Sequence, residues 1–368
     1  MKKTLLGTTA LVAVGLLAGP ALASDPLKVT VGGNVVTGFY VVDSDDIGGL
    51  SVQDTKVAVV ARNIDIIAEG TLDNGLTAGV NAKLMLGSDF SNSTSLANNN
   101  GFATFRQLFA YLEGGFGRFE IGGTDGASYK MHYTSPWFVP GNGVDSPNIY
   151  NSAAGSATRV STFSLLATDA NKVSYFTPRL AGFQLGGSYT PEVTATNVKA
   201  NGLGGLTVGP VNTDEVMEVA LNYAGTIGGL DLGLDGFYTT GSSSVVNADP
   251  VEYGFGANLG IWGFTLGGAF YDSEDVAAPG VSVAGAGQQV WTAGLSYSTG
   301  PWTVGAAYLE AEDETAGSNN ENSIWQVGGG YALGSGVDIG VEYQFINEEA
   351  GIVDYDSQSL GLVLAVGF

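Results

Sequence analysis

The sequence contains no cysteine and only one histidine, His132. Without thiols it can form neither disulfide bonds nor thiolate metal sites, so backbone hydrogen bonds and packing alone must hold the fold. A single histidine excludes the metal motifs that need two, and we expect it to pack within a loop or to line a pore. The one motif like a nucleophile elbow, Gly294 to Ser298, lies inside a strand pattern. The sequence therefore indicates no enzyme.

Basic residues are also scarce, since 13 Lys and Arg stand against 36 Asp and Glu. Residues 1–23 have the pattern of a cleaved signal peptide: two lysines, an uncharged apolar stretch from Leu5 to Ala18, and an Ala-Leu-Ala cleavage site. Without those two lysines, the single domain expected over residues 24–368 keeps 11 basic residues and a formal charge of −25. So acidic a chain cannot neutralise a run of phosphates, which excludes nucleic-acid binding.

Long apolar runs are missing after Ala23, although 44% of the residues are hydrophobic. A membrane helix needs about 20 consecutive apolar residues, so the apolar residues must be arranged in another way. In the last ten residues they alternate with small or polar ones, and one face carries Leu360, Leu362, Leu364, Val366 and Phe368. Such alternation is typical of a strand with lipid on one side and a lumen on the other.

Short and long connections join these strand-like segments in turn. The short ones hold glycine or other turn formers, at 73–75, 114–117, 178–182, 226–229, 262–263, 299–301 and 334–336. The long ones are rich in Asp, Asn, Ser and Gly, at 42–54, 88–101, 124–170, 191–214, 241–250, 273–287, 312–321 and 348–356. Seven short and eight long connections predict an all-β fold, a 16-stranded antiparallel transmembrane β-barrel with its short turns on the periplasmic side.

Aromatic residues close to the strand ends support this fold. Rings with a polar tip favour the headgroup level of a bilayer, where they form two girdles around an apolar band. We assign to these girdles Tyr40, Phe109, Tyr111, Trp137, Trp262, Trp291, Tyr297, Trp302, Tyr308, Trp325 and Tyr343.

Three stretches resemble the general porins of Gram-negative bacteria, most of all the alphaproteobacterial type: residues 72–77 (LDNGLT), 109–123 (FAYLEGGFGRFEIGG) and 175–191 (YFTPRLAGFQLGGSYTP). The terminal Phe368 is similarly typical of the family. The resemblance implies a homotrimer in the outer membrane, in contact with its lipid and lipopolysaccharide. Each barrel would be narrowed by a long third loop and would let small hydrophilic solutes and ions diffuse. A channel selective for one nutrient class, such as sugars, is the alternative function.

The longest connection, from Thr124 to about Asn171, is the expected third loop. A stretch of this length without secondary structure is unusual in a compact domain and is normally functional. Its Met131, Trp137 and Phe138 are too apolar for a freely solvated surface loop, which is the alternative reading, so we expect the loop to fold into the lumen. It supplies three carboxylates to a pore constriction: Asp125, Asp145 and Asp169.

The barrel wall supplies the other candidate charges. By strand alternation, Lys83 faces inward, as do Asp65 and Glu69. General porins usually carry a basic residue where Asp65 stands, and this departure favours cations.

Arg106 is also expected in the lumen, at a position where general porins carry a wall arginine. It is counted on one strand face with Leu108 and Ala110. Phe109 and Tyr111 are then expected to meet lipid or a neighbouring subunit.

One weak metal candidate remains, and we expect no other cofactor. Asp43, Asp45 and Asp54 occupy the first, third and twelfth positions of a possible calcium loop, with Gly48 at the sixth. Ile47 at the fifth position is not a ligand. Acidic loops that bridge divalent ions to lipopolysaccharide are the more diffuse alternative.

Overall fold

The computed structural model describes residues 27–46, 54–86, 103–146, 161–193, 213–243, 247–278, 281–315, 320–351 and 353–368. The expected signal peptide lies outside them. The strands in these residues are β1 (Lys28–Ser44), β2 (Thr55–Thr71), β3 (Thr77–Leu86), β4 (Ala103–Gly114), β5 (Gly117–Gly123), β6 (Asn171–Phe176), β7 (Phe183–Glu192), β8 (Asp214–Ile227), β9 (Leu230–Ser242), β10 (Val251–Ile261), β11 (Phe264–Ala278), β12 (Val281–Thr299), β13 (Trp302–Asp313), β14 (Glu321–Gly334), β15 (Val337–Ala350) and β16 (Val353–Gly367).

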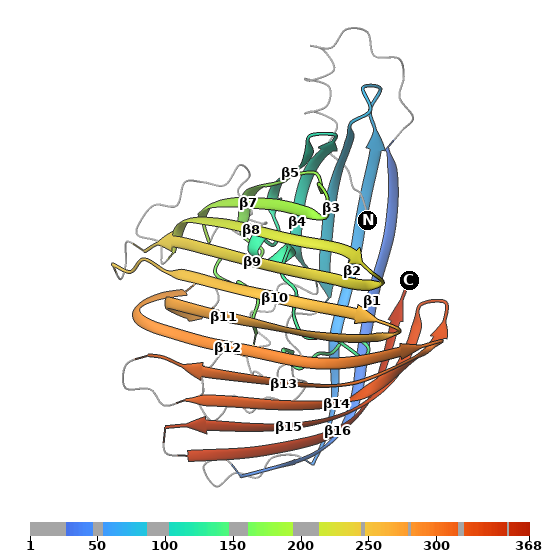
Figure 1. Ribbon diagram of the computed structural model, residues 1–368, viewed down its shortest axis with the longest axis vertical. Coiled ribbons are helices and arrows are strands. Elements are labelled where there is room, and N and C mark those ends of the chain that lie inside the picture. The colour runs from blue at the N-terminus through green and yellow to red at the C-terminus, as the bar shows by residue number, and fades with distance from the viewer. Residues whose placement is uncertain are drawn as a thin grey trace.

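These sixteen strands of the described chain form a closed antiparallel barrel, which confirms the predicted fold class (Figure 1). Each strand pairs with its neighbours in sequence, and β1 closes the barrel against β16 from Asn34↔Gly367 to Ser44↔Ser357. No helix in this part of the chain is long and apolar enough to cross a membrane.

All seven short connections lie where the sequence predicts them. One of the two-residue connections joins β10 to β11 through Trp262 and Gly263. Both have positive φ, 53° and 86°, as a two-residue hairpin turn that matches the strand twist requires.

Two of the predicted long connections, 273–287 and 348–356, are wrong. There β11 continues to Ala278 before β12 begins at Val281, and β15 continues to Ala350 before β16 begins at Val353. The polar composition of these stretches misled the prediction. A strand pair that extends past the apolar band needs no apolar outer face, so its sequence can be polar while the hydrogen-bonded ladder continues. The ladder between β11 and β12 continues here with register shifts on either side of Val276.

The two faces of the barrel differ in chemistry. On β15 the outward Val341 and Tyr343 are 52% and 40% exposed, whereas the inward Glu342 and Gln344 are 0% and 1% exposed. Large apolar side chains therefore cover the outside and polar ones fill the inside, which is the reverse of a soluble barrel.

The aromatic prediction is confirmed only in part. Trp262, Trp291, Trp302, Trp325 and Tyr343 are exposed on the outward face. Tyr297 packs on outward Phe264, and Tyr308 packs between Trp291 and Trp325.

The girdle prediction is wrong for Tyr40, Phe109 and Tyr111. They are buried, at 0%, 6% and 2% exposed, and face inward, while Trp137 lies in the segment between β5 and β6. Closeness to a turn does not by itself say to which face a ring points.

Candidate functional site

The segment between β5 and β6 is described over residues 124–146 and 161–170. It begins with a single helical turn, α2 (Ala127–Lys130). The backbone N–H of Ser128 donates to the inward carboxylate of Glu218 on β8 (3.0 Å). The start of the predicted third loop therefore lies against the inner wall of the barrel (Figure 1).

The same segment follows the wall to the far side of the barrel. The backbone N–H of Tyr133 donates to Asp235 on β9 (2.7 Å), and the Asn142 side chain donates to Glu342 on β15 (2.6 Å). Residues 124–146 thus cross the lumen side of the strands from β8 to β15. Residues 147–160 of the predicted loop lie outside the described part.

A buried carboxylate on β10 holds the returning part of the segment at Ser164, Leu165 and Leu166. Glu252 accepts hydrogen bonds from the hydroxyl groups of Ser164 and of Tyr271 (2.8 Å for the latter). The backbone N–H groups of Leu165 and Leu166 donate to the same carboxylate at 3.4 Å each. A carboxylate removed from water is stable only with such partners, so Glu252 belongs to the structure of the loop.

His132 also belongs to this packing, as the sequence predicts. Its Nδ1 lies 2.9 Å from the Asp235 carboxylate and its Nε2 lies 3.2 Å from the Thr162 hydroxyl. The ring packs edge-on against Phe163 and Phe237, with centroids 5.2 and 5.1 Å away. With both ring nitrogens engaged, it ties the two described parts of the segment to β9.

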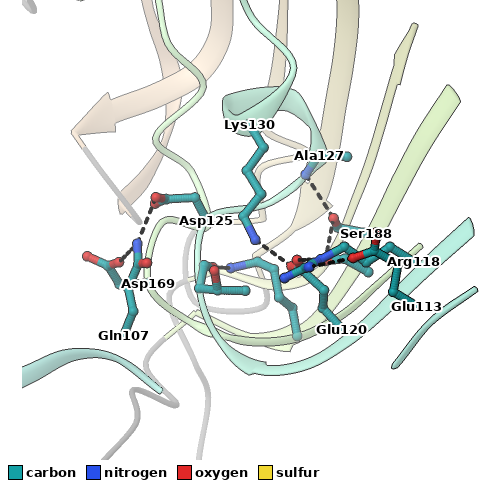
Figure 2. Close-up of polar contacts among 12 residues, drawn as sticks. Gln107, Glu113, Arg118, Glu120, Asp125, Ala127, Lys130, Asp169 and Ser188 are labelled. Atoms are coloured by element: carbon teal, nitrogen blue, oxygen red, sulfur yellow. Dashed lines mark hydrogen bonds and ion pairs between the residues drawn. The ribbon is translucent and has the colours of Figure 1, made fainter. Parts of the chain in front are cut away.

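Five of the predicted site residues gather in one band. Asp65 on β2 is directly opposite Lys83 on β3, and Lys83 is opposite Gln107 on β4. The Gln107 amide donates to the loop carboxylates of Asp125 (2.7 Å) and Asp169 (2.9 Å), as Figure 2 shows. Gln107 therefore links the wall to two loop carboxylates. It was not among the predicted site residues, because a neutral amide carries no charge signal in the sequence.

Arg106 completes the band, since its Nε donates to Asp169 at 2.7 Å. Its inward position has a different cause from the predicted one. The β3–β4 register shifts between Lys83 and Leu84, which leaves Arg106 as the extra residue of a bulge. A bulge re-aims side chains, so Arg106 and Gln107 both reach the lumen, and the alternation count fails here.

Beyond the bulge, the predicted faces of β4 are reversed. Leu108 is exposed on the outside, whereas inward Tyr111 donates to Glu69 (3.0 Å). Inward Phe109 lies under the Lys130 ammonium group, 4.7 Å from its ring centroid. Glu69 thus faces inward as predicted, but it is engaged by a tyrosine.

A second charged cluster, which the sequence analysis missed, lies beside this band. Arg118 bonds to Glu113 (3.0 Å) and Glu120 (2.7 Å), and Lys130 also pairs with Glu120 (Figure 2). The Arg118 guanidinium lies 3.6 Å from the centroid of the Tyr111 ring. Two acids face two bases, so the cluster is electrically balanced.

Asp145 does not join the band. It is 9% exposed and accepts a hydrogen bond from the Trp137 indole N–H (3.0 Å). Burial raises the pKa of Asp145 to about 6, against the smaller opposing effect of its hydrogen bonds. A carboxyl group in this environment is a packing residue of the loop.

The candidate calcium ligands Asp43 and Asp45 have protein partners in the structure. Among the described residues, no group of three or more His, Asp or Glu side chains could hold a metal ion. Asp43 accepts from the Gln358 side chain (2.9 Å), and Asp45 accepts from the Asp356 backbone N–H (3.1 Å). Gly48 lies outside the described residues, and the calcium site stays a prediction.

A closed barrel with an apolar outside, a charged inside and a loop along its lumen defines the class of outer-membrane channel barrels. A family model described as Gram-negative porin matches residues 7–351. The chain therefore belongs to the Gram-negative porin family and resides in the outer membrane.

Solved structures share this fold at low sequence identity. The anion-selective porin from Comamonas acidovorans is 15% identical with a TM-score of 0.63, over 93% of this chain and 100% of that one. OmpT of Vibrio cholerae in its trimer form is 14% identical with a TM-score of 0.62, over 94% and 100%. The outer membrane channel DcaP of Acinetobacter baumannii is 12% identical with a TM-score of 0.61, over 95% and 100%. No protein with a curated description matches the sequence.

Proposed function

We propose that the barrel is a water-filled channel for passive diffusion of small hydrophilic solutes and ions, and that it prefers cations. The band between β2, β3, β4 and the loop carries the proposal. It contains the carboxylates of Asp65, Asp125 and Asp169 against the cations of Lys83 and Arg106. Its net charge is therefore −1, and Asp169 already offsets the charge of Arg106.

Charges elsewhere contribute little to this preference. The Arg118 cluster is balanced, and the loop carboxylates at the barrel ends are separated from the band by water and salt. At physiological ionic strength the Debye length is about 8 Å, so distant charges are screened. The formal charge of −23 is for this reason a poor guide, and the few residues of the band decide ion selectivity.

The test is a reversal-potential measurement on refolded protein in a planar bilayer, under a tenfold KCl gradient. We expect large conductance steps and a reversal potential of the sign that cation permeation produces. An anion-selective reversal potential would contradict the proposed preference. Concentration-dependent block of the current by a sugar would instead favour the substrate-selective alternative. The absence of any conductance would refute both channel functions.

We further propose that three copies assemble. The outward face of β1–β5 carries neither Tyr nor Trp in its described residues, whereas β6–β16 carry the aromatic belt. A gap in the belt is expected where a wall meets protein instead of headgroups. The small, partly exposed residues Ala68, Ala82 and Ala110 on this wall allow the close approach that membrane interfaces favour. Native mass spectrometry is expected to give three times the chain mass; a monomer would contradict the trimer.

A further inference from the structure

A groove on the outer surface of the barrel, distinct from the pore, is unexplained by the function proposed above. It has a volume of about 570 Å³ and crosses four neighbouring strands, β6 to β9. Eight of its ten lining residues form two rows across these strands, Val173, Tyr189, Met217 and Thr240 in one and Tyr175, Gly187, Val219 and Tyr238 in the other; Ser188 and Glu218 complete the lining.

Gly187 creates the hollow. It lies between Tyr175 and Val219 in the ladder and points outward with Leu185 and Tyr189. A Cβ atom added at Gly187 would meet only the Glu218 carbonyl oxygen within 4 Å, at 3.5 Å. The hollow therefore lies where a side chain at this position would stand, and the rings of Tyr175, Tyr189 and Tyr238 form its walls.

We infer that this groove binds an acyl chain of a phospholipid from the periplasmic leaflet. The protein resides in the outer membrane, and the lining residues belong to its apolar outer face, so the medium that fills the hollow is hydrocarbon. Lipid tails are as apolar as the lining. Specific retention must therefore come from close dispersion contacts with the rings that wall the hollow.

A second copy of the chain is the other possible occupant, and the tyrosines argue against it. Three of the ten lining residues are Tyr, a residue type that is enriched on surfaces that meet lipid headgroups. The outward face proposed above for the contact between copies, on β1–β5, has no Tyr or Trp in its described residues.

The leaflet follows from Tyr175. Its hydroxyl donates to the carbonyl oxygen of Phe116, which lies in the short turn between β4 and β5. Short turns are on the periplasmic side, so one end of the groove opens at the periplasmic interface. A phospholipid can enter there with its headgroup in water and one tail in the hollow.

The experiment compares the wild type with two glycine variants, Gly187→Leu and Gly236→Leu, by native mass spectrometry after reconstitution with phosphatidylethanolamine. Gly236 also points outward, on β9, and a Cβ there meets only a carbonyl oxygen at 3.8 Å, but it does not line the groove. We expect Gly187→Leu to retain one phosphatidylethanolamine fewer per chain, and Gly236→Leu to match the wild type. Equal retention in all three proteins, or equal loss in both variants, would overturn the inference.

Two further measurements identify the molecule that occupies the groove. If lipopolysaccharide displaces the retained phosphatidylethanolamine from the wild type, the periplasmic-leaflet assignment is wrong. If Gly187→Leu changes the oligomeric state but not lipid retention, the groove is a contact between copies. Should Gly187→Leu fail to fold, wild-type protein in vesicles of dibrominated phosphatidylethanolamine decides the matter, since cryo-electron microscopy should show bromine density between Tyr175 and Tyr238. An empty groove there would refute the site.

Discussion

The inner surface of the barrel has two regions in which charged side chains have different roles. The covered wall consists of the inward carboxylates beneath the loop: Glu218, Asp235, Glu252 and Glu342. The open wall consists of Asp65, Lys83 and Arg106, which are only partly buried. The carboxylates of the covered wall accept hydrogen bonds from the loop, whereas the Asp65 carboxylate of the open wall is partly exposed. A carboxylate that the loop covers anchors the loop, whereas one that stays exposed to solvent can contribute to ion selectivity. The residue type is the same in both cases.

The largest effect is expected from breaking the covered wall. Glu252→Leu removes the acceptor of two hydroxyl and two backbone N–H groups. Three of these donors, on Ser164, Leu165 and Leu166, belong to the loop. Each buried donor left unpaired costs roughly 1–3 kcal/mol, so the loop should be held less tightly by on the order of 4 kcal/mol. We expect larger, noisier single-channel currents and faster proteolysis within the loop. Glu252→Gln retains an acceptor and is the control; a leucine variant with wild-type currents would refute the anchoring role.

The second effect concerns the cost of burying a carboxyl group. The pKa of Asp145 is raised to about 6, so between about pH 4 and 6 the folded protein holds a proton that the unfolded chain releases. The stability of the wild type should therefore fall as the pH rises through this window. Asp145→Asn should match the wild type at pH 4 and exceed it at pH 7 by up to about 3 kcal/mol. Chemical denaturation at both pH values measures this difference, and a pH-independent difference would contradict the prediction.

On the open wall, Asp65→Arg should move the reversal potential toward anions. The variant changes the charge of the band by two units where water and salt weaken each interaction. We expect about 1 kcal/mol, which is roughly fivefold in the cation-to-anion permeability ratio, and less at high salt. Asp45→Arg makes the same change in net charge at the long-loop end of the barrel and should leave the ratio nearly unchanged. If the two variants shift it equally, the band does not set selectivity.

The smallest effect is expected at the point where wall and loop meet. Gln107→Lys places one positive charge beside Asp125 and Asp169 without changing Asp65, Lys83 or Arg106. The cation preference should fall by about 0.5 kcal/mol, roughly twofold in permeability ratio. Gln107→Met, which keeps the volume but not the amide, is the matched control. A stronger cation preference in the lysine variant would contradict this picture of the band.

Much of the barrel could be predicted from the sequence, because turns and alternation are local signals. The short turn at Trp262 and Gly263 is an example. Alternation failed at Arg106, where a single extra residue reverses the faces of Phe109 and Tyr111. A bulge depends on the neighbouring strand, and one strand's own sequence does not reveal it.

The site was partly predictable for the same reason. Asp65, Lys83 and the loop carboxylates of Asp125 and Asp169 carry charge and were found. The covered wall was not, because Glu218 and Glu252 look like ordinary polar strand residues until a distant segment is laid over them. Contacts of this kind join residues about 90 positions apart, and no local pattern reports them.

The hydrogen bonds between the wall and the loop have a consequence for how the sequences of such pores can vary. At Ser128, Tyr133, Leu165 and Leu166 the wall carboxylates hold main-chain N–H groups, which every residue except proline possesses. Of these residues only Tyr133 and Leu165 are partly exposed, and mutations there can change the side chain and leave the hydrogen bonds to the wall in place. The barrel can therefore stay the same while the sequence of the loop in its lumen changes, in evolution or by protein engineering.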